Sequence, residues 1–322
     1  MSTPLLAVKG LSVRFPLKSG QTVHALTDVS LQVHMGEVLG IVGESGCGKS
    51  TLARAILQLL IPTDGAIHWQ DQRLDAGNKA QLKAYRRAVQ CVFQDPLDAL
   101  NPRMTIAEIL QEPLRTLRPE LGKVAIRERA DALLQAVGLD VAMRERYPHE
   151  FSGGQCQRIG IARALAVEPQ LIVCDEPVSA LDVSLQGQII ALLATLQRQH
   201  QLALLFISHD LGVVKCLCQR VMVLYLGRVM EIAETTDLFA QPLHPYTRLL
   251  LGAIPLADPR QERARLTERA RQLVNSGELP SPLQPPTGCV FHTRCPQAQA
   301  ECSTVVPLLR DVGGRQIACH QV

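Results

Sequence analysis

Short apolar runs in the first forty residues have the length and composition of β-strands. Residues 11–15, 29–33 and 38–42 are rich in valine and leucine, and glycines separate these runs. The pattern predicts an antiparallel start that leads into a buried strand. A glycine-rich turn follows residue 42, and residues 50–60 then place Leu52, Ile56 and Leu60 on one helical face. The sequence therefore predicts a strand, a loop and a helix in that order.

The pattern changes to helices in the middle of the chain and alternates afterwards. Residues 107–150 carry apolar positions at helical spacing, with Pro113, Pro119 and Pro148 as predicted breaks. This region predicts a small inserted helical subdomain at about 95–154. Helices are then predicted over 156–167 and 186–200, and buried strands over 171–174 and 203–208. Apolar strands that alternate with helices predict an α/β fold with a mainly parallel sheet covered on both faces.

The composition shifts after about residue 233, where proline becomes frequent and apolar periodicity fades. The chain of 322 residues also exceeds the roughly 100–200 residues of a typical domain. Both observations predict a large core over residues 1–233 and a separate, loop-rich C-terminal extension over residues 234–322.

The overall composition is that of a globular protein. Apolar residues make up 47% and charged residues 20% of the chain, which argues against disorder. A net charge of +3 is too small to indicate nucleic acid as the main partner. The longest apolar stretches fall short of the ~18 residues that cross a bilayer, and residues 1–10 lack the pattern of a secretory leader. We therefore expect the chain to lie in the cytosol.

A phosphate-binding motif follows the predicted strand at 38–42. Glycines in this turn let backbone N–H groups wrap phosphate oxygens without Cβ clashes, and the helix that follows adds a partial positive charge. We expect Lys49 to neutralise the β and γ phosphates and the Ser50 hydroxyl to ligate Mg²⁺. Alkylation of Cys47, inside the loop, should block ATP binding. The predicted ATP-binding residues are Gly43, Glu44, Ser45, Gly46, Cys47, Gly48, Lys49, Ser50 and Thr51.

Two acids follow the apolar run at 171–174, at the carboxyl end of a predicted parallel strand, where open α/β sheets bind ligands. Asp175 is suited to hold Mg²⁺ directly or through water. Glu176 is suited to act as general base or to orient the attacking water. The alternative is an acidic turn without function, and the phosphate-binding motif disfavours it.

The turn formed by Ser152, Gly153, Gly154 and Gln155 resembles the signature of ABC ATPases. In that family two nucleotide-binding domains close head to tail, so the resemblance implies that this turn meets the γ-phosphate held by the other subunit. A helix N-terminus with small residues presents N–H donors to an anion. Cys156 departs from the family, which more often carries Arg or Lys there, and we expect tuning rather than loss of activity.

Other elements of the ABC family follow in the family's order. Gln94 resembles the Q-loop, Asp182 in Ser-Ala-Leu-Asp resembles the D-loop, and His209 in Ser-His-Asp resembles the switch histidine. The resemblance implies that Gln94 contacts Mg²⁺ or the attacking water and that its loop senses a membrane partner. It also implies that His209 contacts the γ-phosphate and stabilises charge in the transition state. Phe15 resembles the residue that stacks on adenine, with a core aromatic as the alternative.

Proline-rich motifs mark the C-terminal extension: His-Pro-Tyr-Thr at 244–247, Gly-Glu-Leu-Pro-Ser at 277–281 and Pro-Pro-Thr-Gly-Cys at 285–289. They resemble the extension of ATPases from dipeptide, oligopeptide and nickel importers, closest to the dipeptide type. Four cysteines there suit either Zn²⁺ or an iron–sulfur cluster. Because members of this group carry such clusters, we expect a 4Fe–4S cluster rather than zinc or free thiols. The expected ligands are Cys289, Cys295, Cys302 and Cys319.

The remaining cysteines are predicted to pack rather than to bind metal. Cys216 and Cys218 lie two positions apart in a predicted helix, on different faces. Cys91 and Cys174 lie in predicted buried strands, where a thiol behaves as a small apolar group.

Together these resemblances cover nearly the whole chain. They imply a P-loop NTPase fold of the ABC nucleotide-binding type, with an antiparallel β subdomain, an inserted helical subdomain and a loop-rich C-terminal extension. The implied function is binding and hydrolysis of MgATP to energise an importer of dipeptides or oligopeptides. An importer of nickel or another small solute is the closest alternative. A soluble ABC ATPase without a transport role is disfavoured, because such proteins generally show long coiled-coil insertions or two cassettes.

The importer resemblance also implies partners and a location. The implied partners are a paralogous ATPase subunit, two transmembrane permease subunits and a periplasmic substrate-binding protein, with no nucleic acid. The implied location is the cytoplasmic face of the inner membrane, reached through the permease subunits.

Overall fold

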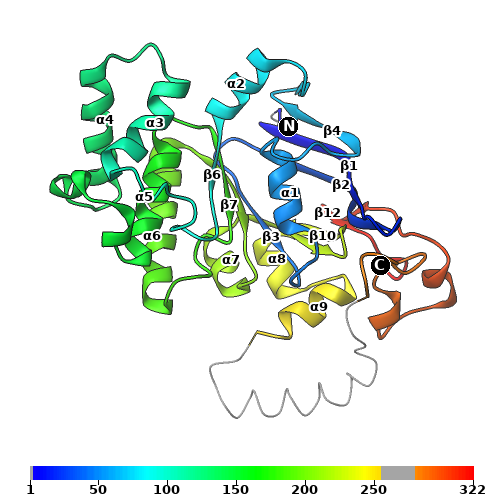
Figure 1. Cartoon of the computed structure of the whole chain (residues 1–322). Helices are drawn as coiled ribbons and strands as arrows, with labels where there is room; N and C mark the ends of the chain where they lie inside the picture. The colour runs from blue at the N-terminus through cyan, green and yellow to red at the C-terminus, as the bar shows by residue number, and fades with distance from the viewer. Residues whose placement is uncertain (1–2, 255–279) are drawn as a thin grey trace, which may run out of the picture.

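The computed structural model describes residues 3–254 and 280–322 of the chain (Figure 1). The described strands form two sheets, one in the order β2-β1-β4-β5 and one in the order β11-β12-β10-β9-β3-β8-β7-β6. The smaller sheet is antiparallel, as predicted for the start of the chain. Its strands are β1 (Leu6–Pro16), β2 (Thr22–Val33), β4 (Asp64–Trp69) and β5 (Gln72–Arg73).

The centre of the large sheet is parallel and mostly buried. Every residue of β3 and β8 is buried, which explains why both strands are continuous apolar runs. Because parallel strands end at the same edge of a sheet, the turn after β3 and the two acids at the end of β7 lie close together. The parallel strands are β3 (Val38–Val42), β6 (Val89–Val92), β7 (Leu171–Asp175), β8 (Ala203–Ile207) and β9 (Arg220–Tyr225).

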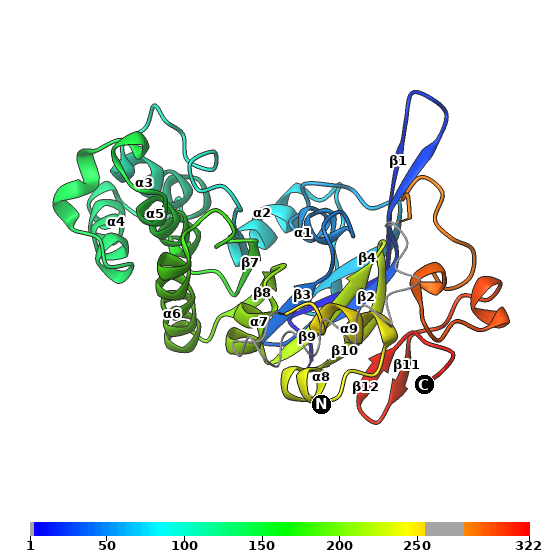
Figure 2. The same cartoon turned by 90° about the horizontal axis from the view of Figure 1, so that it is seen from below.

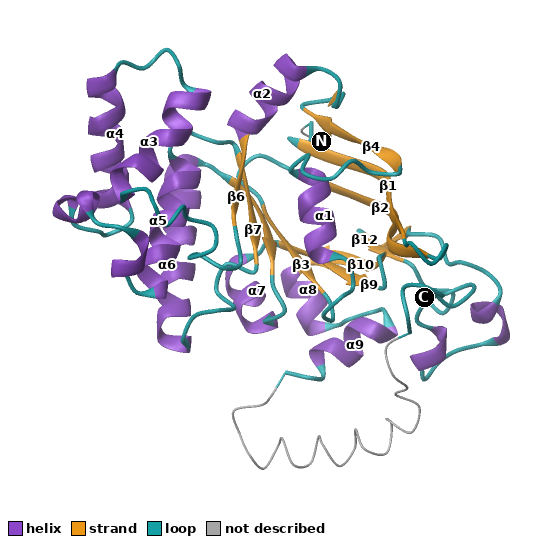
Figure 3. Ribbon diagram, in the orientation of Figure 1, coloured by secondary structure: helices purple, strands orange, loops and turns teal. Residues whose placement is uncertain are grey.

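Helices cover both faces of the large sheet, as predicted (Figure 3). Alternate residues of β3 show this, since Leu39 and Ile41 pack in one apolar cluster with α1 and the antiparallel sheet, while Val38 and Val42 pack in another. The first cluster also contains Tyr85 of α2. The helices are α1 (Lys49–Ile56) and α2 (Lys79–Ala88) on one face, and α5 (Gly153–Leu165), α6 (Val183–His200), α7 (Leu211–Leu217) and α8 (Thr235–Ala240) on the other.

A helical subdomain lies at one end of the large sheet (Figure 2). It contains α3 (Ile106–Leu117), α4 (Lys123–Ala136), and 3-10 helices over Val141–Glu145 and Pro148–Glu150. The predicted helical insertion is therefore present, but the break predicted at Pro113 is wrong. Pro113 lies inside α3 and is buried in the subdomain core. The free energy gained by burying its ring offsets the loss of the backbone hydrogen bond that a proline cannot donate.

Several predicted helix boundaries also differ from the structure, and α5 ends at Leu165 rather than at residue 167. α1 ends at Ile56 rather than at residue 60, and Gln58 then adopts a positive φ of 55° that turns the chain away. α5 begins at Gly153 and α6 at Val183, each three residues earlier than predicted, because Ser152 and Asp182 occupy the N-cap positions.

The C-terminal extension is loop-rich, as predicted, but it is not separate from the core. Its hairpin of β11 (Arg310–Val312) and β12 (Arg315–Ile317) pairs with β10 (Arg228–Glu234) and continues the large sheet. The extension also contains α9 (Pro245–Leu251) and 3-10 helices over His292–Arg294 and Ala300–Ser303. The boundary between residues 233 and 234 falls at the end of β10, and we retain it as a proposal. In the part of the chain that the structure describes, no helix is long and apolar enough to span a bilayer.

Candidate functional site

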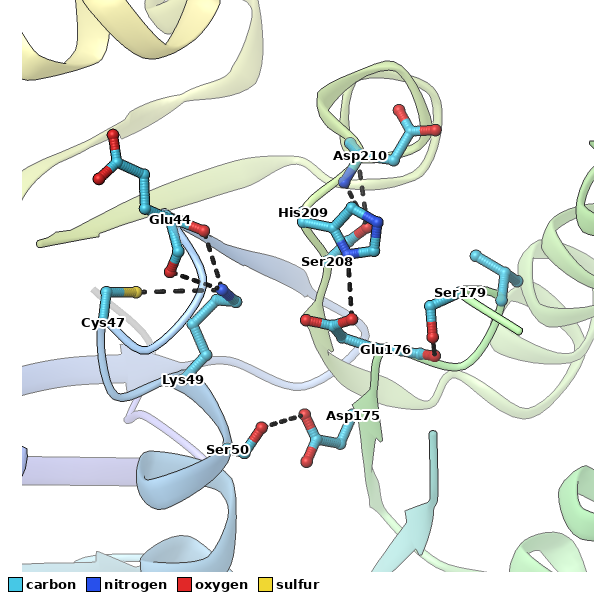
Figure 4. Close-up of polar contacts among 12 residues, drawn as sticks. Glu44, Cys47, Lys49, Ser50, Asp175, Glu176, Ser179, Ser208, His209 and Asp210 are labelled. Atoms are coloured by element: carbon cyan, nitrogen blue, oxygen red, sulfur yellow. Dashed lines mark hydrogen bonds and ion pairs between the residues drawn. The ribbon is translucent and has the colours of Figure 1, made fainter. Parts of the chain in front are cut away.

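The loop between β3 and α1 places the predicted phosphate-binding residues at the carboxyl edge of the large sheet (Figure 4). Lys49 is 5% exposed, and its Nζ donates hydrogen bonds to the carbonyl oxygens of Gly43 at 2.8 Å and Glu44 at 3.1 Å. A Cβ at Gly43 would lie 2.1 Å from the carbonyl oxygen of Leu224, so only glycine fits there. The N-terminus of α1 has no side-chain cap. Its first-turn N–H groups are therefore open to an anion such as phosphate.

Ser50 and Asp175 meet across the edge of the sheet (Figure 4). Ser50 Oγ donates to Asp175 Oδ1 at 3.1 Å. Burial raises the pKa of the Asp175 carboxyl, and the Ser50 hydroxyl opposes that rise. Hydroxyl and carboxylate oxygens are hard ligands of the kind that Mg²⁺ prefers, and a bound cation would relieve the burial of a negative charge. The pair fits the predicted magnesium site.

Glu176 and His209 form a second pair at the same edge. The His209 Nδ1 lies 3.0 Å from Glu176 Oε2, and because the acceptor is a carboxylate oxygen, Nδ1 carries the proton. Glu176 has a positive φ of 48°, which is unfavourable for a residue with a side chain. Three hydrogen bonds to its backbone hold it there: its N–H donates to the Ile207 carbonyl at 3.1 Å, and its carbonyl accepts from Ser179 Oγ at 3.0 Å and from the Ser179 N–H at 3.2 Å. The sequence predicted a phosphate contact for His209 and did not predict this pair.

Gln94 and Phe15 lie at the margins of the site. Gln94 is exposed and follows β6, the strand that neighbours β7, so its loop begins at the same edge of the sheet as Asp175. Phe15 lies near the end of β1 and is 37% exposed. The alternative of a core aromatic at Phe15 is therefore wrong, and stacking on adenine stays a prediction.

The predicted signature turn is an exposed helix N-terminus. Ser152 is the N-cap of α5, and it forms a capping box in which its N–H donates to Gln155 Oε1 at 3.0 Å. Ser152 and Gly153 are exposed, whereas Gly154 is buried against Leu185, whose Cδ1 would lie 3.3 Å from an added Cβ. Asp182, at the N-cap of α6, is exposed and makes no side-chain cap. The turn and Asp182 therefore both face outward.

Cys156 and the other core thiols are mostly packing residues. Cys156 is fully buried, and its Sγ lies 3.5 Å from the Pro148 carbonyl oxygen. Cys174 and Cys218 are buried, as predicted, whereas Cys91, predicted to be buried in its strand, is only half-buried. The prediction for Cys216 is wrong, because it lies on the outer face of α7 and is exposed.

Cys47 is poorly placed for the predicted alkylation. It is 1% exposed, and burial raises the pKa of its thiol despite the nearby Lys49 ammonium. A protonated, covered thiol reacts slowly, so the predicted block of ATP binding requires the loop to open first.

The four cysteines of the extension lie near one another but do not form a metal site here. Burial, followed by the neighbouring thiols, raises the pKa of Cys289 to about 11. Cys302 and Cys319 are also buried, and Cys295 is half-buried. In residues 3–254 and 280–322, no group of three or more His, Cys, Asp or Glu residues is arranged to hold a metal ion. The predicted iron–sulfur cluster, and zinc as its alternative, therefore gain no support.

Two residues of the extension reach the phosphate-binding loop, and neither role was predicted from the sequence. Tyr246 of α9 accepts a hydrogen bond from the Glu44 N–H at 3.0 Å through its hydroxyl. Arg294 donates to both carboxylate oxygens of Glu44, at 2.8 and 3.0 Å. In the sequence, Tyr246 stands out only as part of the His-Pro-Tyr-Thr motif at 244–247, and no sequence pattern indicates a role for Arg294.

Two family models match the sequence. Residues 26–179 match a model described as "ABC transporter", and residues 230–302 match one described as "Oligopeptide/dipeptide transporter, C-terminal region". The chain is 50% identical over 326 aligned residues to "Oligopeptide transport ATP-binding protein OppF" of Escherichia coli (strain K12), covering 99% of this chain and 96% of that protein. It is 48% identical over 318 residues to "Putative oligopeptide transport ATP-binding protein YkfD" of Bacillus subtilis (strain 168), covering 98% and 95%.

Solved structures share the fold. One is the "Dimeric structure of a post-hydrolysis state of the ATP-binding cassette MJ0796 bound to ADP and Pi", with 30% identity and a TM-score of 0.65 over 71% of this chain and 98% of that chain. Another is "Structure of cbiO1 from clostridium perfringens: Part of the ABC transporter complex cbiONQ", with 27% identity and a TM-score of 0.67 over 83% of this chain and 100% of that chain. Their fold is the one predicted from the sequence.

Proposed function

Because this chain belongs to the ATP-binding subunits of ABC transporters that carry an oligopeptide/dipeptide C-terminal region, we propose that it hydrolyses MgATP to drive the import of short peptides. The predicted family and fold class are confirmed by the same matches. The observation that carries the proposal is the meeting of the buried Lys49, the Ser50–Asp175 pair and the Glu176–His209 pair at one edge of the sheet.

The site residues divide the chemistry between binding and hydrolysis. The Lys49 ammonium now contacts two carbonyl oxygens, and the β and γ phosphates of ATP offer it stronger, charged acceptors. Ser50 and Asp175, with Gln94, would hold Mg²⁺, which neutralises phosphate charge when bound. Glu176 Oε2 accepts the proton of the attacking water or orients it, and His209 holds that carboxylate in place through Nδ1–H.

A second ATP-binding subunit completes the site in this proposal. The exposed Ser152–Gly153 turn offers N–H donors of α5 to an anion from outside the chain, and Asp182 lies beside it at the N-cap of α6. The related cassette described as bound to ADP and Pi is itself described as dimeric. We propose that the facing subunit is a paralogue.

A cleft of about 1000 Å³ supports contact with a membrane permease. It is lined by Phe93, the neighbour of Gln94, and lies between α2, β6 and α3. Its wall is largely apolar and its rim carries Lys79, Lys83, Arg86 and Glu112. A permease segment bound in the cleft would contact the loop that positions Gln94. This contact would couple docking of the permease to ATP hydrolysis. We propose that two permease subunits dock in this way, place the chain on the cytoplasmic face of the inner membrane, and receive substrate from a periplasmic binding protein.

The four-cysteine metal site remains a separate proposal. Its support is the proximity of the thiols of Cys289, Cys295, Cys302 and Cys319: burial, and to a smaller extent the neighbouring thiols, raise the pKa of Cys289, Cys295 and Cys319. The thiols would have to rearrange to bind a 4Fe–4S cluster or zinc. Anaerobic purification followed by iron, sulfide and zinc analysis tests it, and a protein without bound metal refutes it.

Uptake by the reconstituted transporter tests the main proposal. Lys49→Ala removes the only positive charge that the loop brings to the phosphates among its described residues, so ATP hydrolysis should fall by about 10²- to 10³-fold and peptide uptake should stop. The matched control is Lys123→Ala, which removes an exposed lysine at the start of α4 and should leave both rates unchanged. Normal uptake by Lys49→Ala would refute the proposal.

A further inference from the structure

An acidic residue stands inside the phosphate-binding loop. Glu44 follows Gly43 directly, and its carbonyl oxygen shares the Lys49 ammonium with that of Gly43. Its carboxylate points away from Lys49 (Figure 4). A negative charge this close to a triphosphate repels it, and the repulsion weakens binding unless a cation compensates.

Arg294 supplies that cation from the other end of the chain. Its two terminal nitrogens contact the two Glu44 carboxylate oxygens at 2.8 and 3.0 Å, the two-point geometry that makes arginine–carboxylate pairs strong. The Arg294 side chain is 11% exposed and that of Glu44 is 26% exposed, so solvent screens the pair only in part. The Arg294 guanidinium also lies 5.7 Å from the centre of the Tyr225 ring, a cation–π distance.

An aromatic cluster fixes the position of Arg294 and of the loop together. The ring centres of Tyr225 and Tyr246 lie 4.6 Å apart, and that of Phe291 lies 5.3 Å from each. All three residues are fully buried. Tyr225 ends β9, Tyr246 belongs to α9, and Phe291 precedes the 3-10 helix that carries Arg294. The cluster therefore joins the large sheet to the extension.

Tyr246 adds a direct contact to the loop backbone. Its hydroxyl accepts the N–H of Glu44 at 3.0 Å, so it fixes the peptide plane that precedes the carbonyl contacted by Lys49. One residue of the loop is thus held at its backbone by Tyr246 and at its side chain by Arg294.

We propose that Arg294 and Tyr246 are positioning residues of the ATP site, through which the C-terminal extension sets the affinity of the loop for MgATP. Arg294 neutralises the Glu44 carboxylate and turns it away from the phosphates, while Tyr246 holds the Glu44 backbone. This inference rests on the proposed binding of ATP at Lys49. Both residues contact Glu44 rather than Glu176 or His209, so their loss should act on ATP binding and leave hydrolysis at saturating ATP nearly unchanged.

Rescue by a second substitution that removes the Glu44 charge distinguishes this role from simple support of the fold. Arg294→Gln leaves the Glu44 carboxylate unpaired and should raise the Kd for MgATP about tenfold, measured by titration calorimetry on the full chain. Adding Glu44→Gln removes the repulsive charge, so the double variant should return to within about threefold of the wild-type Kd. A residue that merely supported the fold would show no such rescue.

Three further variants complete the experiment. Arg294→Lys keeps the charge but loses the two-point contact, and it should raise the Kd about threefold. Should Arg294→Gln fail to fold, this variant and Tyr246→Phe, which loses only the hydroxyl, carry the test. Arg310→Gln is the matched control, because Arg310 is an extension arginine that contacts the Cys319 carbonyl and not the loop. Its Kd should equal that of the wild type.

The outcomes distinguish the inference from the function on which it rests. If the wild type binds MgATP and Arg294→Gln binds it equally well, the inference is refuted and the ATP site stands. If Glu44→Gln fails to rescue a weakened Arg294→Gln, the charge argument is refuted. If the wild type itself binds no MgATP, the proposed function fails.

Discussion

The parallel edge of the large sheet and the C-terminal extension approach the same loop but hold their side chains by different means. Ser50, Asp175 and Glu176 occupy or directly follow regular elements, and His209 lies two residues after β8. Backbone pairing along buried strands fixes them. Arg294 lies in a three-residue 3-10 helix, and side-chain packing around Phe291 fixes it.

This difference separates two properties of the enzyme. We propose that the residues fixed by the sheet act on phosphate and water and set the rate of hydrolysis. The residues fixed by the aromatic cluster would act on the loop and set its affinity for MgATP. Changes in the extension should therefore alter stability and ATP binding, whereas changes at the sheet edge should alter turnover.

Truncation of the aromatic cluster has the largest expected effect on stability. Phe291→Ala removes a fully buried ring that contacts Tyr225 and Tyr246. We expect the free energy of unfolding to fall by about 3–5 kcal/mol in urea titrations. In the folded variant the KM for ATP should rise, while kcat at saturating ATP stays near that of the wild type.

A surface residue of the same extension provides the control. Val306 is 40% exposed, so Val306→Ala should change stability by less than about 0.5 kcal/mol. Equal stability of Phe291→Ala and the wild type would contradict the proposed role of the cluster.

The Glu176–His209 pair should give a smaller effect, confined to turnover. His209→Ala removes the N–H that holds the Glu176 carboxylate, and we expect kcat to fall about 10- to 100-fold with little change in the KM for ATP. His209→Asn keeps an N–H donor near the Nδ1 position and should recover part of the loss. An Asn variant as slow as the Ala variant would show that this hydrogen bond is not the function of His209.

Thiol labelling should give the smallest effect on activity. Cys216 is exposed and should react first with a maleimide, while Cys47 is 1% exposed with a raised pKa and should react slowly. One equivalent of reagent should leave ATP hydrolysis intact, and Cys216→Ser should abolish this fast phase. Rapid loss of ATP binding in Cys216→Ser would show that Cys47 is reachable without opening of the loop.

Much of the fold and of the ATP site could be predicted because their signals are local. The buried strands at 38–42 and 203–208 are continuous apolar runs, and the glycine-lysine loop follows directly from one of them. Asp175 could be placed beside Ser50 because Asp175 ends one parallel strand and Ser50 comes soon after another strand of the same sheet. In each case a local pattern marks the strand or loop that carries the residue, and the parallel topology of the sheet then brings the strand ends together.

What could not be predicted depends on residues far apart in the chain. Arg294 and Glu44 are 250 positions apart, and neither has a pattern that points to the other. A proline is expected to break a helix because it lacks a backbone N–H, but tertiary packing keeps Pro113 inside α3. Cys216 and Cys218 look alike in sequence, and only the packing of α7 shows which of them is exposed.

Nucleotide trapping by Glu176→Gln tests the central claim most directly. The amide keeps the shape of the side chain but cannot accept the proton of the attacking water. We predict that the purified variant, assembled with its partners, binds MgATP with the wild-type Kd. Its rate of ATP hydrolysis should be lower than that of the wild type by about 10²-fold or more. Hydrolysis at the wild-type rate would contradict the account, because the water would then be activated by another group.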